Sequence, residues 1–368
     1  MLIPRLWGFS LVIAVAMTFS AAAQERVVNI YNWSDYIDPK VLDQFTAETG
    51  IKVVYDVYDD NKILETKLLA GRTGYDIVVP SAYFLQRQIL AGVYQPLDRS
   101  KLANEKNLWP ALMKRMEIYD PGNRYAINLM WGTTGIGVNV DKVKAALGSV
   151  PDSWSLVFDP ANMAKLQGCG VTMLDAPDDV LPAALNYLGL DPNSKNVDDL
   201  QKAADVVAKV RPYIRNFTSS AYIEGLATGD ICIAIGWSGD ILQARDRALE
   251  AAKGLDTKPI NVAYILPREG GQIWFDSVAI PADAPHPDEA HQFLNFIMRP
   301  EIAAQISNYV RYASGNLAAK DRIDPAMVND PTVYPGDQVM NRLYTITMYD
   351  NAVTRAMTRM WTRIATQQ

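Results

Sequence analysis

The chain has very few of the residues on which most catalytic and metal centres depend. It contains 368 residues but only two histidines and two cysteines. His286 and His291 stand five positions apart, a spacing that does not place them on one helix face, so no metal site is expected. The sequence has no Cys-x-x-Cys, His-Glu-x-x-His or Walker phosphate loop, and no cofactor is expected.

Two glycine-containing segments also fall short of known enzyme motifs. Gly135-Ile136-Gly137 lacks the third glycine of a dinucleotide fingerprint, and residues 236–239 lack the spacing of a nucleophile elbow. Neither histidine has a visible pairing with Ser238. No catalytic residue is predicted, although paired aspartates leave a carboxylate-dependent hydrolase open.

A long hydrophobic run is absent except at the N-terminus. Arg5 precedes an apolar stretch from Leu11 to Phe19, which Ala21-Ala22-Ala23 follows. This pattern predicts a cleaved secretory signal peptide over residues 1–23, and the run is too short for a comfortable membrane span. We therefore expect an exported protein that begins near Gln24 and has a length that suits two domains.

Positive charge is in the minority. The chain carries 35 lysines and arginines against 41 aspartates and glutamates, a formal net charge of −6. This balance argues against nucleic acid or an anionic membrane as partner and suits a cationic one. No oligomeric interface is visible in the sequence, so a monomer is expected by default.

The two cysteines are Cys169 and Cys232. An even count in an exported chain favours a disulfide between them over two buried free thiols.

What the chain does have is four short segments rich in aromatic residues. They are Asn32–Tyr36, Gly236–Asp240, Trp274–Asp276 and Tyr309–Tyr312. The first three place a ring beside a carboxylate, and a ring face and a carboxylate both attract cations. If the fold brings these segments together, they predict a site for a small cation with several charges. If it does not, they are ordinary core packing and turns.

The first hundred residues alternate between strand and helix patterns. The expected order is strand, helix, strand, helix, strand, over residues 27–31, 38–50, 51–57, 61–70 and 76–79. This order predicts a parallel sheet whose ligands bind beyond the carboxyl ends of the strands. Asn32–Tyr36 follows the first strand and Pro80–Tyr83 the third, so both are expected at one edge of the sheet.

Two later strands are expected to cross between two domains. Tyr125–Val140 is apolar with a break at Gly132–Gly135, and Ile273–Ile280 would return the chain to the first domain. The expected division places residues 24–131 and 273–312 in lobe 1 and residues 132–272 and 313–368 in lobe 2, with the ligand cleft at the hinge.

Six segments spread along the chain follow a known pattern. They are Val28–Ile37, Gly50–Asp56, Asp76–Ser81, Thr133–Gly137, Leu174–Pro177 and Gly229–Asp240. Together they resemble the periplasmic polyamine-binding proteins of ABC importers, especially the putrescine-binding branch. The resemblance implies an α/β fold of the type II Venus-flytrap kind, with two lobes that are each a mixed, mostly parallel sheet flanked by helices. It also implies a periplasmic location, an inner-membrane ABC permease as partner, and a bonded cysteine pair.

The resemblance further implies a set of ligand-binding residues. By position, these are Trp33, Ser34, Asp35, Tyr36 and Ser81 from the first lobe, Asp179, Trp237 and Asp240 from the second, and Trp274, Asp276 and Tyr312 at or near the hinge strands. With putrescine, Asp240 and Asp276 would hold one ammonium group and Asp35 or Asp179 the other. The rings of Trp33, Trp237 and Trp274 would enclose the methylene groups and add cation–π attraction.

Three positions depart from the putrescine-binding pattern. Trp274 stands where phenylalanine is usual and Tyr83 where a small residue is usual, both as in spermidine binders. Asp179 stands where glutamate is more usual, whereas Ala176 keeps the putrescine pattern. The sequence therefore predicts a binder of putrescine or a close polyamine, with a preference for spermidine as the runner-up.

Three other functions stay open at this point. A secreted hydrolase could use the aspartate pairs, and a sensor module could present bound polyamine to a membrane receptor. Ferric-ion binding by a two-lobed protein is disfavoured, because no histidine lies beside the tyrosines in the sequence.

Overall fold

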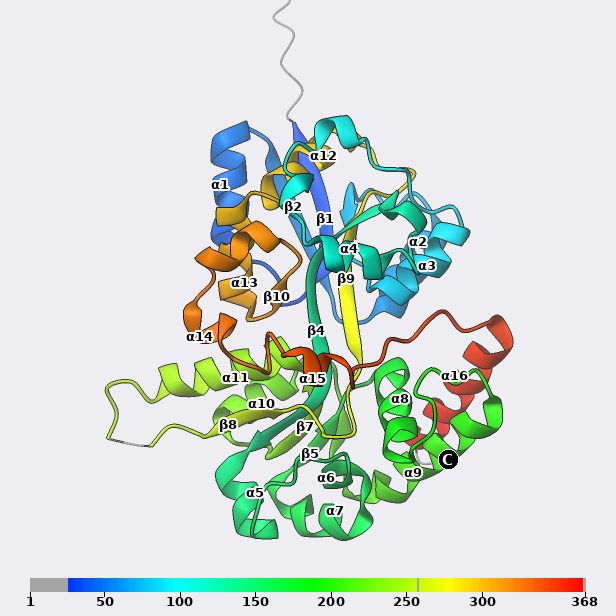
Figure 1. Cartoon of the computed structure of the whole chain (residues 1–368), viewed down its shortest axis with the longest axis vertical. Helices are drawn as coiled ribbons and strands as arrows, with labels where there is room; N and C mark the ends of the chain where they lie inside the picture. The colour runs from blue at the N-terminus through cyan, green and yellow to red at the C-terminus, as the bar shows by residue number, and fades with distance from the viewer. Residues whose placement is uncertain (1–25, 257, 367–368) are drawn as a thin grey trace, which may run out of the picture.

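The computed structural model describes residues 26–256 and 258–366. The signal peptide predicted over residues 1–23 lies outside the described residues. Figure 1 shows two lobes, one above the other, joined by the long strand β4 (Ala126–Asn139) and by β9 (Ile273–Ala279). Within the described part of the chain, no helix is long and apolar enough to cross a membrane.

The upper lobe begins with the alternating order that the sequence predicts. Strand β1 (Val27–Trp33) pairs in parallel with β2 (Lys52–Tyr58) and with β3 (Ile77–Val78), and the connections are α1 (Pro39–Thr49) and α2 (Asn61–Ala70). Both helices start at an aspartate, Asp38 or Asp60, whose side chain accepts a hydrogen bond from the backbone N–H two residues on. Local capping therefore fixes where these helices begin.

One sheet runs through both lobes. Its strand order is β2-β1-β3-β9-β4-β7-β5-β6, and β8 and β10 also pair with β4. The first half of β4 pairs antiparallel with β9 and the second half with β7 (Ile233–Trp237) and β8 (Val262–Ile265). In the lower lobe β5 (Val171–Met173) runs parallel to β7 and to β6 (Asn216–Phe217), while β10 (Ala313–Ser314) lies against β4 in the upper lobe.

Gly132 and Gly135 do not interrupt the crossing strand, contrary to the expected break. All of β4 is buried, and it continues through both glycines. A Cβ atom at Gly132 would lie 2.7 Å from the ring of Trp274. Glycine at this position therefore makes room for an aromatic ring at the junction of the lobes.

Helices cover the sheet in both lobes (Figure 1). The other helices that pack in the upper lobe are α3 (Ala82–Leu90), α4 (Pro110–Met116), α12 (Pro287–Ile297), α13 (Pro300–Val310) and α14 (Pro325–Val328). Those in the lower lobe are α5 (Val140–Leu147), α6 (Ser155–Phe158), α7 (Pro160–Leu166), α8 (Pro177–Tyr187), α9 (Val197–Val210), α10 (Tyr222–Thr228), α11 (Ser238–Ala251) and α16 (Asn351–Thr366). The short α15 (Asp337–Met340) lies between the lobes in Figure 1. Short 3₁₀ turns occur at Arg99–Lys101, Glu105–Asn107, Pro121–Asn123, Gln167–Cys169, Arg211–Tyr213 and Leu317–Arg322.

Each lobe has its own hydrophobic core. Phe45 packs against Phe293 and Phe296 in the upper core, with ring centroids 5.1 and 5.3 Å apart. Trp154 and Phe158 belong to the lower core. The expected lobe boundary near residue 312 does not match the packing, because the buried side chains of Ala313, Ala319, Ile323, Met327, Val333 and Ile346 all belong to the upper core. We propose that the chain enters the lower lobe only between Ile346 and Tyr349, which packs in the lower core.

The chain crosses between the lobes a third time, in the segment from residue 341 to residue 350. Tyr344 exchanges backbone hydrogen bonds with Gly271 and Ile273, beside the start of β9. The backbone carbonyl of Ile346 accepts a hydrogen bond from Tyr119 in the upper lobe, and the N–H of Thr347 donates to Asn193 in the lower lobe. Three crossings therefore connect the lobes, and the third comes later in the chain than the boundary expected at residue 312.

The predicted disulfide is confirmed. Cys169 and Cys232 are bonded, with Cα atoms 5.5 Å apart. The bond joins the turn before β5 to the residue just before β7, so it fixes the strand that leads to Trp237.

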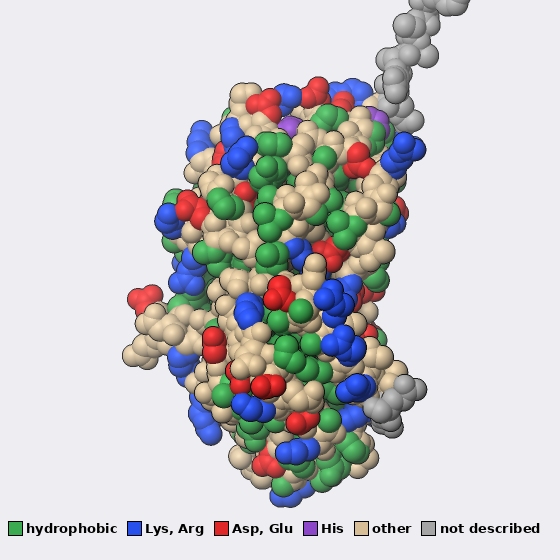
Figure 2. Space-filling model, turned by 90° about the vertical axis from the view of Figure 1, so that its right-hand side faces the viewer, with side chains coloured by type: hydrophobic (Ala, Val, Ile, Leu, Met, Phe, Trp, Pro, Cys, Tyr) green, Lys and Arg blue, Asp and Glu red, His purple; other side chains and the backbone are tan. Residues whose placement is uncertain are grey.

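Acidic and basic side chains are interspersed over both lobes on the face in Figure 2. Ion pairs on the surface of the protein include Arg26 with Glu289 at 3.0 Å and Arg299 with Glu48 at 2.6 Å. Exposed pairs of this kind contribute about 0–1 kcal/mol each. This face thus mixes both signs of charge, in contrast to the pocket between the lobes, whose charged side chains are all acidic among the described residues.

Candidate ligand-binding site

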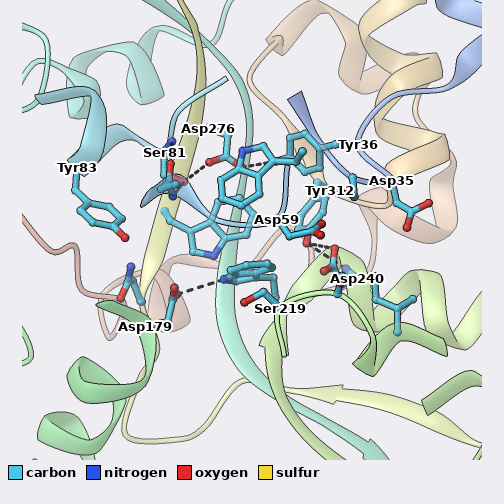
Figure 3. A pocket seen from close by; sticks show the side chains of 18 residues that line it. Asp35, Tyr36, Asp59, Ser81, Tyr83, Asp179, Ser219, Asp240, Asp276 and Tyr312 are labelled. Carbon is cyan, nitrogen blue, oxygen red and sulfur yellow. Dashed lines mark hydrogen bonds between the residues drawn. The ribbon is translucent and has the colours of Figure 1, made fainter. Parts of the chain in front are cut away.

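A pocket lies between the lobes, where β4 and β9 cross (Figure 3). Its space, including the open mouth, is about 620 Å³. The structure brings all twelve predicted site residues to its walls: Trp33, Ser34, Asp35, Tyr36, Ser81, Tyr83, Asp179, Trp237, Asp240, Trp274, Asp276 and Tyr312. The four aromatic segments therefore converge, as the cation-site hypothesis requires.

Asp276 is delivered by strand β9 and is 5% exposed. Its two carboxylate oxygens accept hydrogen bonds from the hydroxyls of Tyr36 (2.6 Å) and Ser81 (2.7 Å). Ser81 is held in turn by Asn61, whose amide donates to the Ser81 hydroxyl and accepts from its backbone N–H, both at 3.0 Å. Burial raises the pKa of Asp276 to about 6, and the two hydroxyls oppose this rise.

Asp240 lies in the first turn of helix α11. One carboxylate oxygen accepts a hydrogen bond from Tyr222 at 2.6 Å, and the other accepts from Tyr312. Tyr312 belongs to the upper core and Tyr222 to the lower core, so one phenol from each core holds this acid. Burial raises the pKa of Asp240 to about 6.

Asp179 lies in the first turn of helix α8 and is 6% exposed. It accepts hydrogen bonds from the hydroxyl of Thr134 (2.6 Å) and from the indole N–H of Trp237 (3.3 Å). Burial raises its pKa to about 7. Both lower-lobe acids thus sit at helix N-termini, where the backbone dipoles favour negative charge.

The pocket walls carry no basic side chain among the described residues. A buried carboxylate without a cationic partner is costly, and the raised pKa values of all three acids express this cost. A ligand with positive charges would supply the missing partners. The arrangement is therefore suited to binding a cation.

Aromatic rings line the pocket between the acids. The rings of Trp33 and Trp237 lie 5.9 Å apart at an angle of 71°, and those of Trp274 and Tyr312 lie 5.2 Å apart at 68°. Trp33 is fixed by its indole N–H, which donates to the carbonyl of Val79 at 2.9 Å. Such rings offer faces to both methylene groups and ammonium groups.

Asp35 and Ser34 lie towards the edge of the pocket, in the turn after β1. The side chain of Asp35 is 49% exposed, and its carboxylate is 3.4 Å from the guanidinium of Arg247 on α11. The left-handed backbone of Asp35, with φ of 53°, belongs to this turn. Of the two candidates for the second ammonium group, the structure places only Asp179 in a buried position without a cationic partner.

The two histidines have structural surroundings. The Nδ1 atom of His286 lies 3.1 Å from buried Asp76, and Nε2 of His291 accepts a hydrogen bond from the N–H of Asp98 at 2.9 Å. In residues 26–256 and 258–366, no three histidine, cysteine, aspartate or glutamate side chains are grouped to hold a metal ion.

Comparison with known families decides the class of this two-lobed fold. Residues 40–335 match the model of the bacterial extracellular solute-binding protein family. The chain belongs to this family.

Related solute-binding proteins extend over almost the whole chain. The putrescine-binding periplasmic protein SpuD of Pseudomonas aeruginosa is 54% identical over 345 residues, which are 93% of each chain. The putrescine-binding periplasmic protein PotF of Escherichia coli is 50% identical over 364 residues, 97% of each chain. A solved structure, a putative spermidine/putrescine ABC transporter from Listeria monocytogenes, superposes with a TM-score of 0.82 at 31% identity and covers 93% of this chain and 100% of its own.

Six residues that line the pocket of this solute-binding protein were not predicted from the sequence. The additional wall residues are Asp59, Asn61, Ser219, Ser220, Ile223 and Gln272. Asp59 and Asn61 follow strand β2 directly, so the rule that ligands bind beyond strand ends would have found them. Thr134 and Tyr222 support the acids from behind the walls, and their roles depend on contacts that no local pattern announces.

Proposed function

We propose that this solute-binding protein captures putrescine in the periplasm and delivers it to the permease of an ABC importer. The observation that carries the proposal is a pocket with three buried aspartates and, among its described wall residues, no basic side chain. Two relatives that share at least half of its residues are named as putrescine-binding periplasmic proteins. Periplasmic delivery also accords with the signal peptide predicted in residues 1–23.

The positions of the acids suit a diamine. Asp240 and Asp276 face the pocket from opposite lobes (Figure 3), and together they would hold one ammonium group. Asp179 would hold the other, and Asp35 would stay at the rim with Arg247. A neutral analogue would leave the buried acids without a partner, so the site would select for charge.

Closure of the lobes would strengthen this binding. The ligand would touch walls from both lobes, and excluding water lowers the local dielectric constant and strengthens each charge interaction. The permease would then recognise the closed form. We expect a monomer with no affinity for nucleic acid, since acidic residues outnumber basic ones and both kinds are interspersed on the face in Figure 2.

We further propose that the bound amine leaves unchanged. Each buried aspartate already accepts two hydrogen bonds from hydroxyl or indole groups, and no histidine lines the pocket among the described residues. A nuclear magnetic resonance spectrum of putrescine after long incubation with the protein should show the starting amine alone. A converted product would favour the hydrolase alternative.

Calorimetric titration tests the main proposal. The ligand-stripped protein lacking residues 1–23 would be titrated with putrescine and then spermidine at one ionic strength. Binding of putrescine with a Kd of about 1 μM or tighter, roughly −8 kcal/mol, would support the proposal. The absence of heat with either amine, from protein that unfolds cooperatively, would overturn it.

A spermidine-preferring site is the second candidate. Trp274 and Tyr83 both line the pocket, as in the spermidine-type pattern. The pocket also adjoins a small cavity lined by Tyr83, Gln272, Trp274 and Ile346 among others. The Gln272 Oε1 atom is buried and has no hydrogen-bond partner among the described residues, so one acceptor remains for the ammonium group of a longer amine.

The variant Trp274→Phe separates the two candidates. A smaller ring should shift the ratio of the two Kd values towards putrescine, by about fivefold if the indole platform is worth roughly 1 kcal/mol to the longer ligand. Parallel titrations with both amines measure this ratio. An unchanged ratio would remove Trp274 as the determinant of preference.

A further inference from the structure

Tyr222 stands directly behind the pocket without lining it. It is the first residue of α10 and is 1% exposed. Its hydroxyl donates a hydrogen bond to Asp240 at 2.6 Å and accepts one from the backbone N–H of Trp237 at 3.2 Å. A single buried phenol therefore contacts an acid and the backbone of an aromatic residue that both face the ligand.

The sequence makes space for this ring. A Cβ atom at Gly236 would lie 2.6 Å from Cε2 of Tyr222. Glycine in strand β7 therefore allows the ring to lie close against the strand that leads to Trp237 and Asp240. This close contact fixes the ring, and with it the direction of the hydroxyl.

The two phenols that hold Asp240 differ in the lobe to which they belong. Tyr312 packs in the upper core, whereas Tyr222 packs in the lower core together with α11, the helix of Asp240. If the lobes separate as the two cores suggest, Tyr312 would move away with the upper lobe and Tyr222 would stay. Tyr222 would thus be the donor that Asp240 keeps in an open protein.

We propose that Tyr222 is a positioning residue that holds Asp240 aimed and ionised in the open lower lobe, ready for a cationic ligand. This inference rests on the proposed function. A hydrogen bond from a neutral donor stabilises the charged form of a carboxylate. It opposes the burial that raises the pKa of Asp240 to about 6.

Other groups also act on this acid. The groups that face Asp240 are Tyr36, Tyr312, Asp35, Asp276 and Arg247. Two ion pairs also involve helix α11: Arg247 pairs with Glu224, and Asp246 pairs with Arg311. They are unchanged when only the Tyr222 oxygen is removed. A change in the titration of Asp240 in that variant therefore reports on the Tyr222 hydroxyl.

The test is Tyr222→Phe, which keeps the ring and removes the hydroxyl. Its affinity for putrescine at neutral pH should fall about tenfold or more, because the variant loses a hydrogen bond to a charged group. The midpoint of the pH dependence should move upward by about one unit. In an Asp240→Asn background the same change should have little further effect, because the tyrosine acts through the acid.

Tyr264→Phe is the matched control. Tyr264 is another buried tyrosine of the lower core, and its hydroxyl contacts Thr133 and no acid. This variant should leave the pH midpoint unchanged. If Tyr222→Phe does not fold, Gly236→Ala displaces the same ring and should change affinity and midpoint in the same direction.

Two results would overturn the inference. One is an affinity loss in Tyr222→Phe that is equal at every pH with an unmoved midpoint, and the other is no loss at all. The ligand-free titration of Asp240, followed by nuclear magnetic resonance of labelled aspartate, separates this inference from the proposed function. An unchanged midpoint there refutes the role of Tyr222 even in a protein that does not bind putrescine, whereas a raised midpoint supports it.

Discussion

The two lobes present their carboxylates to the pocket in different ways. The upper lobe supplies Asp276 from a strand and satisfies it with two hydroxyl groups. The lower lobe supplies Asp179 and Asp240 from the first turns of two helices, where the dipole favours a negative charge by about 0.3–1 kcal/mol. Yet burial raises the pKa of Asp179 to about 7, above the value of about 6 for Asp276.

The difference teaches which effect is larger. At Asp179 the loss of water outweighs both the helix N-terminus and two hydrogen bonds. Neither lobe neutralises its acids with a basic side chain at the pocket wall, within the described chain. The positive charge that both lobes lack is what a polyamine would bring.

The largest expected effect comes from removing one acid from each lobe. Asp276→Asn and Asp240→Asn should each weaken putrescine binding by about 3–5 kcal/mol, because each removes one of the two carboxylates that hold a buried ammonium group. Calorimetric titration measures both losses. Similar losses would mean that the two lobes grip the same ammonium group despite their different construction.

The control for these variants is Asp205→Asn, on the exposed side of α9. It should bind putrescine as the unaltered protein does. If Asp276→Asn and Asp240→Asn also bind normally, the assignment of the site is wrong.

The next effect is a dependence of affinity on pH. The three carboxyl groups must be ionised to pair with ammonium groups, and their raised pKa values of about 6 to 7 mean that protons compete with the ligand in this range. Affinity should therefore rise as pH increases from about 5 to about 8, by up to about tenfold per unit for each proton released, and then level off. Titrations at several pH values in buffers of different ionisation enthalpy measure both the affinity and the protons released.

Asp179→Asn sharpens the comparison between the lobes. Without the acid whose pKa is about 7, the upper part of the pH dependence should flatten, and the part near pH 6 should remain. A flat profile in the unaltered protein would contradict the presence of protonated acids in the free pocket.

The smallest expected effect concerns the acid at the rim. Asp35 pairs with Arg247 across the two lobes, but both side chains are substantially exposed. Asp35→Asn should therefore weaken putrescine binding by only about 0.2–1 kcal/mol, and added salt should reduce the difference. A loss as large as that of Asp276→Asn, measured by the same titration, would place Asp35 on the ligand and contradict the distinction between rim and interior.

The parts of the fold set by local chemistry could be predicted from the sequence. Asp38 and Asp60 cap their helices, Gly50 ends the first one with φ of 69°, and the strands between them alternate or are apolar. The places of Trp33 and Asp240 followed from putting each of their segments at a strand end. These inferences need only local signals and the geometry of parallel sheets.

The parts that failed depend on contacts between distant segments. The residues after 312 were expected in the second lobe, yet buried side chains from Ala313 to Ile346 pack in the upper core, a contact that no local pattern specifies. The sequence placed Asp35 beside Trp33 and Tyr36 without showing that its turn points the carboxylate towards Arg247. Likewise nothing near Tyr222 or Thr134 in the sequence indicates the aspartates that they hold, 18 and 45 residues away.

The three chain crossings at the junction have a mechanical consequence. Two strands running side by side would form a ribbon that bends and also twists easily, whereas β4, β9 and the segment from residue 341 to residue 350 are tied to one another by hydrogen bonds. We expect such a triple connection to resist torsion and to leave bending as the soft degree of freedom. The lobes would then retrace one path at every cycle, so that Asp240 and Asp276 return to the same mutual position each time a ligand is taken up.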